Sequence, residues 1–150
     1  MQIKTQPSMT VLFSTYETTL KELPAYVGTA VKELYKQVVE LDLLITGPQY
    51  WFYYGADGKP DTRFTLEIAI PVRGTLSEGL PSNIKQLPPF RCLSAVHEGP
   101  WDKMSQLYPK MMKYIGEKGL TLNGIISEAY LQFDFAAPEN NLTEVHIGLI

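Results

Sequence analysis

The sequence contains a single cysteine, Cys92, among its 150 residues. One thiol cannot form an intramolecular disulfide or a cysteine-based zinc site. The two histidines, His97 and His146, lie far apart and have no partners at the spacing of metal ligands. We therefore expect neither a metal nor another cofactor, and we expect Cys92 to be a buried, inert thiol.

The sequence also lacks a large excess of charge of either sign, and it has no long apolar run. The chain has 13 basic and 16 acidic residues, a net charge of −3, and no run of Lys or Arg, which disfavours nucleic-acid binding. No apolar stretch is long enough to cross a bilayer, and the N-terminus lacks the apolar core of a signal peptide. Glycine-rich phosphate-binding motifs are missing as well. These absences indicate a cytoplasmic protein without a membrane or nucleic-acid partner.

An internal duplication is the most informative pattern that is present. Four pairs of residues are each separated by 77 positions: Gly47 and Gly124, Tyr53 and Tyr130, Glu67 and Glu144, and Ile70 and Ile147. Two copies of one unit imply a pseudo-twofold axis, and ligands tend to bind in the groove between such halves. We expect one domain over 1–150, with repeat one at about 9–72, a linker at about 73–90 and repeat two at about 91–150.

Each repeat is predicted to be a strand, a helix and two further strands. In the first half these are strand 10–16, a helix from about Pro24, and strands 50–54 and 64–72, by apolar periodicity and turn residues. The second half has strand 91–97, a helix around 104–117 and strands 125–133 and 142–150. Pro109 implies that the second helix begins near it or is kinked. Consecutive short strands imply antiparallel hairpins and an α+β class.

Strand alternation predicts which side chains share a face. Ile68, Ile70, Val145 and Ile147 are expected to pack under the helices, and Ala129, Leu131 and Phe133 to form the apolar side of their strand. Four other side chains are then expected on the sheet face without helices: Trp51, Tyr53, Glu128 and Tyr130. If the halves curl around their axis, these residues line the groove.

A carboxylate among aromatic rings has a chemical consequence. Burying an ionised Glu128 costs several kcal/mol unless the charge is paired. A cationic ligand would supply the charge and gain about 0.5 to 2 kcal/mol per well-placed ring. The alternative is that Glu128 is solvated at a sheet edge or pairs with Lys or Arg.

The motifs resemble those of the GyrI-like small-molecule-binding domains. His97-Glu98-Gly99-Pro100-Trp101 resembles their H-x-G-P-aromatic signature. The segments beginning at Gly47-Pro48 and Gly124 resemble their two G-P-x-x-x-x-Y segments, and Thr143-Glu144-Val145 resembles their closing strand. Ile125 stands where the family has proline after the second glycine. The same fold serves as the effector-binding domain of AraC-type and MerR-type multidrug regulators and is related to the SOUL haem-binding group.

The resemblance implies a glutamate that meets lipophilic, cationic, often polyaromatic drugs and dyes in a cleft between the repeats. That glutamate corresponds to Glu128, and the ligand-binding wall to Trp51, Tyr53, Tyr130, Trp101 and His97. We expect a stand-alone multidrug sensor or sequestering protein without its own helix-turn-helix, as a monomer or homodimer.

Two other functions stay open at this point. Some stand-alone relatives resemble hydrolases of electrophilic cyclopropane-bearing compounds. In that case Glu128 would be the general base, and Tyr130 or Tyr53 would position water or donate a proton. Protein interaction, such as gyrase inhibition, is the third hypothesis, and a net charge of −3 is too mild to support it.

Overall fold

The structure is a computed structural model that describes residues 1–25, 27–74 and 83–150, with only the backbone of Val27. Along the chain the elements are β1 (Gln2–Gln6), β2 (Met9–Thr18), η1 (Leu23–Ala25), α1 (Val27–Glu40), β3 (Leu44–Ile45), β4 (Gln49–Tyr54), β5 (Phe64–Arg73), β6 (Ile84–Leu87), β7 (Phe90–Glu98), η2 (Trp101–Gln106), α2 (Leu107–Glu117), β8 (Leu122–Gln132), η3 (Pro138–Asn140) and β9 (Leu142–Leu149). The strand–helix–strand–strand order expected for each half is confirmed. Strands β1, β3 and β6 were not predicted, and residues 75–82 of the expected linker lie outside the described residues.

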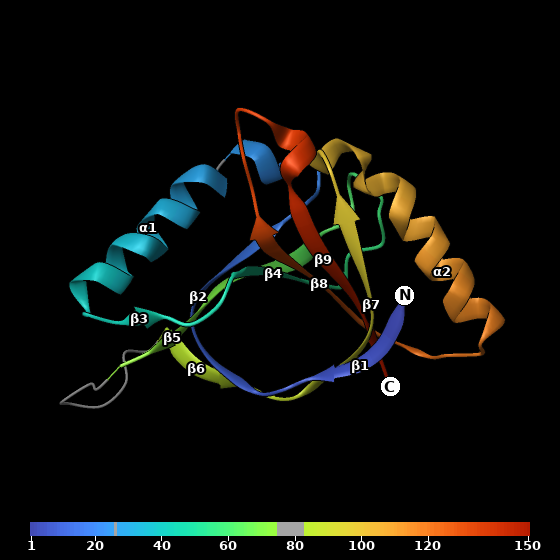
Figure 1. Ribbon diagram of the computed structural model, residues 1–150, viewed down its shortest axis with the longest axis horizontal. Helices are drawn as coiled ribbons and strands as arrows, with labels where there is room; N and C mark the ends of the chain where they lie inside the picture. Colours follow the sequence, from blue (N-terminus) through green and yellow to red (C-terminus); the bar gives the residue numbers. More distant parts are fainter. Residues whose placement is uncertain (26, 75–82) are drawn as a thin grey trace.

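The strands form a curved antiparallel sheet in the order β1-β7-β9-β8-β4-β5-β2-β6, with β3 attached to β5. This confirms the α+β class. Outward from the centre, β4-β5-β2 follows the same order as β8-β9-β7, as a duplication requires (Figure 1). The central pair joins Trp51 to Glu128, and these two residues are 77 positions apart, like the four pairs in the sequence. A pseudo-twofold axis relating the two halves would therefore pass between Trp51 and Glu128.

The unpredicted strands β1 and β6 connect the two halves. Strand β1 leads into β2 but pairs with β7, whereas β6 leads into β7 but pairs with β2. The register continues unbroken from the β1–β7 ladder into the β2–β6 ladder, because Gln6 pairs with Phe90 and Met9 pairs with Leu87. Figure 1 shows this ribbon curving beneath the rest of the sheet. Short strands of mixed polarity have weak periodicity, and only their partners across the fold stabilise them.

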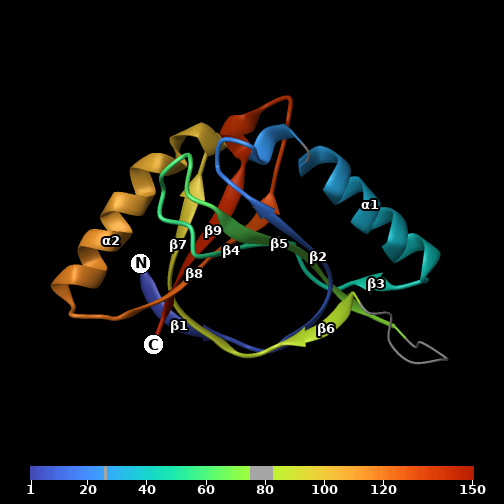
Figure 2. The ribbon, with the colours of Figure 1, turned by 180° about the vertical axis from the view of Figure 1, so that it is seen from behind.

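Both helices cover the same face of the sheet, one over each half (Figures 1 and 2). Helix α1 buries Ala30, Leu34 and Val38, which share a core with strand residues that include Ile68 and Ile70; Val145 and Ile147 pack in a second core with residues of α2. The predicted burial of these isoleucines and of Val145 under the helices is thus confirmed.

The position of Pro109 resolves the ambiguity in the second helix. It is the third residue of α2, whose first residue is Leu107. The first turn of a helix has no internal acceptor for its N–H groups, so proline is tolerated there without a kink.

A buried polar network lies on the opposite face of the sheet. The fully buried imidazole of His146 lies 3.0 Å from the Ser127 hydroxyl through Nδ1 and 3.4 Å from a Glu144 oxygen through Nε2. Glu144 also accepts hydrogen bonds from Lys4 and Ser94. Burial lowers the pKa of His146 below its usual 6.5, although the Glu144 carboxylate acts to raise it.

The His146 network predicts a loss of stability in mild acid. Because the folded-state pKa of His146 lies below 6.5, protonation favours the unfolded chain. The stability gained from neutral His146 is present above pH 6.5 and decreases as the pH falls below that value. His146→Gln should flatten the pH dependence of the free energy of unfolding between about pH 7.5 and pH 5, measured by urea titration. An equally steep dependence in the variant would contradict this assignment.

Candidate functional site

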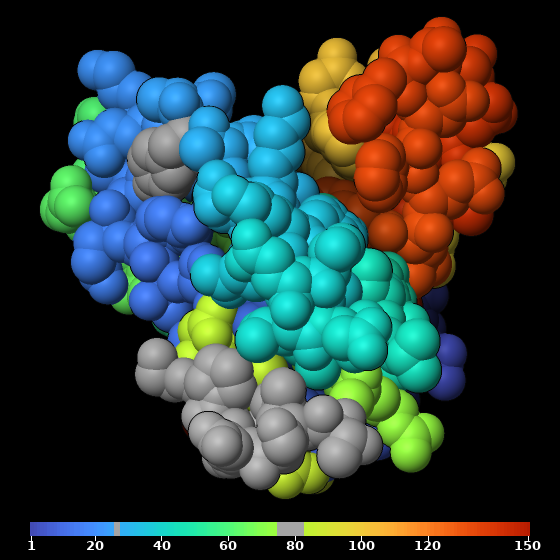
Figure 3. Space-filling view, turned by 90° about the vertical axis from the view of Figure 1, so that its left-hand side faces the viewer, coloured from blue at the N-terminus to red at the C-terminus, as the bar shows by residue number. Residues whose placement is uncertain are grey.

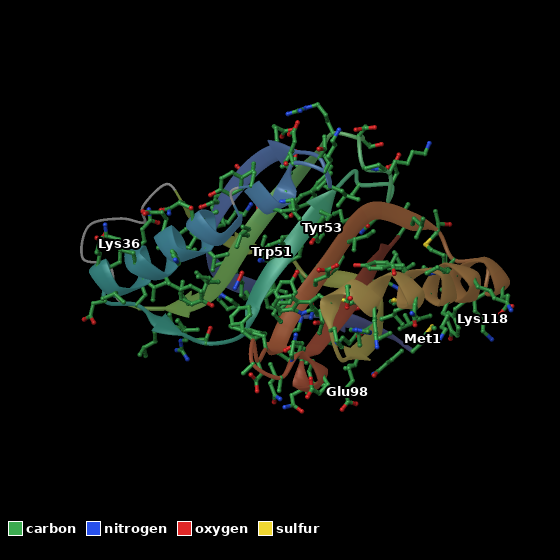
Figure 4. All side chains as sticks on the ribbon, turned by 90° about the horizontal axis from the view of Figure 1, so that it is seen from above. Met1, Lys36, Trp51, Tyr53, Glu98 and Lys118 are labelled. Carbon is green, nitrogen blue, oxygen red and sulfur yellow. The ribbon has the colours of Figure 1, made fainter. Side chains whose placement is uncertain are left out.

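Trp51, Tyr53, Glu128 and Tyr130 were expected on the sheet face without helices, and this expectation is wrong. The pairing register places them on the face that the helices cover. Residues directly opposite in an antiparallel pair point to the same side. Glu128 pairs with Val145, and Trp51 pairs with Ile68, and both partners are buried under the helices. Figure 4, seen from the helix side, shows the labelled Trp51 and Tyr53 on β4 between the two helices.

The expected apolar side of β8 is also partly wrong. Ala129 is fully buried, but Leu131 and Phe133 are each 47% exposed. The β8–β9 register shifts between Tyr130 and Gln132, and β8 ends at Gln132. The strict alternation on which the prediction relied therefore stops at Tyr130.

Three tyrosine hydroxyl groups surround the Glu128 carboxylate. Tyr130 donates to Oε2 at 2.6 Å and Tyr53 to the same oxygen at 3.3 Å, while Tyr108 donates to Oε1 at 2.5 Å. Glu128 is only 8% exposed. These donors come from three elements, β8, β4 and α2, so the carboxylate lies where both halves of the chain meet.

The three phenols are held in their protonated, donating form. Burial raises the pKa of Tyr53 and of Tyr108 well above the usual 10.0, and the nearby Glu128 charge raises both further. The pKa of Tyr130 is also raised well above 10.0 by burial, by Tyr53 and by Glu128. At neutral pH the site therefore offers phenol donors to one carboxylate.

Glu128 has no basic partner among the ion pairs of the described residues. The other deeply buried carboxylate, that of Glu67, is paired with Lys85 at 2.6 Å. Hydrogen bonds from phenols satisfy the lone pairs of a carboxylate, but they do not neutralise its charge. The alternative of a solvated or Lys/Arg-paired Glu128 therefore does not fit the described residues.

A cavity of about 820 Å³ opens beside Glu128 on the side of α2. This volume falls within the range of pockets that enclose small organic ligands. Its walls are mostly apolar, and they include Tyr53, Tyr108, Met112, Leu122 and Ile126 together with Glu128. Asp57, in the loop after β4, is a second acidic residue of this lining, which contains no Lys, Arg or His among the described residues.

The other predicted binding residues do not line this cavity. Trp51 and Trp101 each contact Tyr130 edge to face, with ring centroids 5.5 Å apart in both pairs. His97 donates through Nε2 to the Pro100 carbonyl oxygen at 2.8 Å, within its own turn. The lining of the cavity contains none of Trp51, Trp101, Tyr130 and His97, so their binding roles stay predictions.

Two parts of the cavity wall were missed by the sequence reasoning. Tyr108 was predicted only as part of the helix around 104–117, and no functional role was predicted for the loop after β4. The Gly55 N–H donates to the Gly124 carbonyl at 3.1 Å, which holds the loop that follows against β8 at the cavity. The pairing of Glu128 with Val145 is the signal that could have found them. Val145 was predicted to lie under a helix, so its cross-strand partner Glu128 lies on the same face and within reach of Tyr108 on α2.

Two general absences apply to the described parts of the chain. No helix there is long and apolar enough to cross a membrane. Nor do the described residues bring three or more His, Cys, Asp or Glu side chains together in a way that would bind a metal ion.

Comparison with known proteins identifies the family. Residues 1–149 match the GyrI-like small-molecule-binding domain, and the chain belongs to this family. No curated protein sequence matches it significantly.

Solved structures share the fold at low sequence identity. The EcmrR C-terminal domain superposes with a TM-score of 0.78 at 18% identity, covering 99% of this chain and 96% of that domain. In the EcmrR–DNA complex the match spans only 56% of the EcmrR chain. SAV2435 bound to tetraphenylphosphonium has a TM-score of 0.63 at 15% identity, with 100% and 94% of the two chains covered. A hydrolase from Listeria innocua has a TM-score of 0.67 at 17% identity, with 99% and 91% covered.

Proposed function

We propose that this protein binds lipophilic aromatic organic cations in the Glu128 cavity, as a cytoplasmic multidrug sensor or sequestering protein. The observation that carries the proposal is the buried Glu128 carboxylate, which accepts hydrogen bonds from three neutral phenols and has no basic partner among the described residues. The cost of desolvating this charge is several kcal/mol. A bound cation offsets that cost, so the cavity favours cations over neutral molecules of equal shape.

The surrounding rings support the same ligand class. Tyr53 and Tyr108 line the cavity next to the carboxylate, and their faces attract a cation by about 0.5 to 2 kcal/mol each when well placed. Met112 adds a flexible, polarisable wall that adapts to ligands of different shape. The ligand bound to SAV2435, tetraphenylphosphonium, is a lipophilic cation of this kind.

A pair of ligands with matched rings tests this proposal. Methyltriphenylphosphonium and triphenylphosphine oxide carry the same three phenyl groups, but only the first is charged. We expect calorimetric titration to give micromolar affinity for the cation and at least about tenfold weaker binding of the oxide. Equal affinities, or no binding of the cation at millimolar concentration, would refute the proposal.

Hydrolysis is the second candidate, and one observation favours it. A carboxylate in contact with protonated phenols has the composition of a general base and a general acid. Glu128 would take a proton from the water whose oxygen attacks the ester carbonyl carbon or a cyclopropane carbon. Tyr53, which lines the cavity, or Tyr130 would donate a proton to the oxygen or carbon that leaves. Product formation that depends on Glu128 and on one of these tyrosines would identify an enzyme, whereas binding without product would identify a sensor or sequestering protein.

A further inference from the structure

The loop between β4 and β5, residues 55–63, forms part of the wall of the Glu128 cavity. Asp57 and Gly58 of this loop line the cavity together with Leu20, which precedes η1. Asp57 is exposed to solvent, whereas Glu128 is 8% exposed. In Figure 3 the loop, in green, projects at the edge of the molecule opposite the orange β8–β9 connection. The cavity therefore has one buried carboxylate and a second one at its opening.

The Asp57 carboxylate is held in place by its own loop. Its Oδ1 accepts the backbone N–H of Lys59 at 2.9 Å, and its Oδ2 accepts the Thr62 hydroxyl at 2.9 Å. The Lys59 N–H and the Thr62 hydroxyl lower the pKa of Asp57 below its usual 3.8, so the group is charged at neutral pH. Each carboxylate oxygen has two lone pairs and uses one of them here, which leaves acceptor capacity for a further partner.

The charge of Asp57 is not neutralised within the protein. The described residues form no ion pair with Asp57. The Lys59 ammonium contributes a small attraction that also lowers the pKa of Asp57, but Lys59 does not line the cavity. Two negative charges thus share a cavity whose described lining has no basic residue, and their combined field favours more than one positive charge.

A ligand with one positive charge answers only half of this field. When such a ligand lies against Glu128, Asp57 stays unpaired at the opening. A second cationic group at the opening would keep most of its hydration and would still be attracted to Asp57, so its desolvation cost is small. The apolar walls between the two carboxylates, which include Met112 and Ile126, suit a chain of methylene groups.

We propose that the Glu128 cavity selects elongated dications, with a lipophilic cationic group at Glu128, an apolar chain, and a second, hydrated cationic group such as a primary ammonium at Asp57. This inference rests on the proposed function. It adds Asp57 as a residue that determines specificity and two separated positive charges as the feature that is recognised. Because Asp57 is exposed, its effect on affinity is much smaller than that of Glu128.

The test uses 4-aminobutyl-triphenylphosphonium and 4-hydroxybutyl-triphenylphosphonium. The two compounds share rings and chain length, but at neutral pH only the amine has a second positive charge. At low ionic strength we expect calorimetric titration to give about threefold tighter binding of the amine to the wild type. Asp57→Asn should reduce this preference to less than about 1.5-fold and change the affinity for the alcohol less than about twofold. The two-carbon and six-carbon pairs of amine and alcohol vary the separation of the charges.

Asp61→Asn is the matched control. It lies in the same loop and changes the net charge equally, but Asp61 does not line the cavity, so the preference for the amine should remain. No preference at any of the three chain lengths, or an equal loss of preference in the two variants, would overturn the inference. The proposed function would still stand if the alcohol binds and Glu128→Gln weakens it. If neither compound binds the wild type, the proposed function fails and this inference fails with it.

Discussion

Replacing Glu128 with glutamine should weaken the binding of methyltriphenylphosphonium about 100-fold, equivalent to about 2.7 kcal/mol. Glutamine keeps the length of the side chain, and its carbonyl oxygen still accepts hydrogen bonds from the surrounding tyrosines. The substitution therefore removes the negative charge while leaving the shape of the cavity nearly unchanged. Calorimetric titration of both proteins at the same ionic strength measures the effect. Binding of triphenylphosphine oxide should change less than about threefold, since it does not depend on the charge.

Glu144 provides the matched control for this substitution. Its carboxylate is also partly buried, but it lies on the opposite face of the sheet and pairs with Lys4. Glu144→Gln should leave the affinity for the cation within about twofold, although it removes an ion pair. Unchanged affinity in Glu128→Gln, or an equal loss in Glu144→Gln, would show that the Glu128 charge does not select the ligand.

Replacing Leu34 with alanine should destabilise the protein by about 2 to 5 kcal/mol. Leu34 lies on the inner side of α1, is 1% exposed, and belongs to the core that joins this helix to the sheet. The substitution removes buried methyl groups and leaves a cavity that a packed sheet cannot fill. Urea unfolding followed by circular dichroism measures the change in the free energy of unfolding.

Val39 lies on the same helix and is the control for Leu34. Its side chain is 78% exposed, so Val39→Ala removes little buried surface and should change stability by less than about 0.5 kcal/mol. A loss below about 1 kcal/mol in Leu34→Ala, or equal losses in the two variants, would mean that α1 does not depend on this contact.

Local periodicity was sufficient to locate the main elements. The spacing of Ala30, Leu34 and Val38 predicted α1, and the alternation around Ile68 and Ile70 predicted β5 and its buried face, because each pattern records which side of an element meets the core. Strands β1 and β6 left no comparable pattern. They are short, and their pairing with strands of the opposite half is a long-range event that neither segment specifies alone.

The error over the sheet face has a definite cause. The repeat showed that Glu128 and Trp51 are equivalent, but alternation within one strand does not say which side faces a helix. The cross-strand partners decide it: Glu128 lies opposite Val145, and Val145 is in the core of α2. Because Glu128 lies on the face that α2 covers, the Tyr108 hydroxyl donates to its carboxylate, and the cavity lies under α2.

The sequence by itself determined the α+β class and the order of elements, and it singled out Glu128 as a candidate site residue, because composition, spacing and repetition are properties of the chain. Only the tertiary structure decided which face the carboxylate occupies, that three phenols from separate elements surround it, and that a cavity opens beside it under α2. These features depend on side chains brought together across strands, and their physical effect comes from burial, which no single segment of the chain contains.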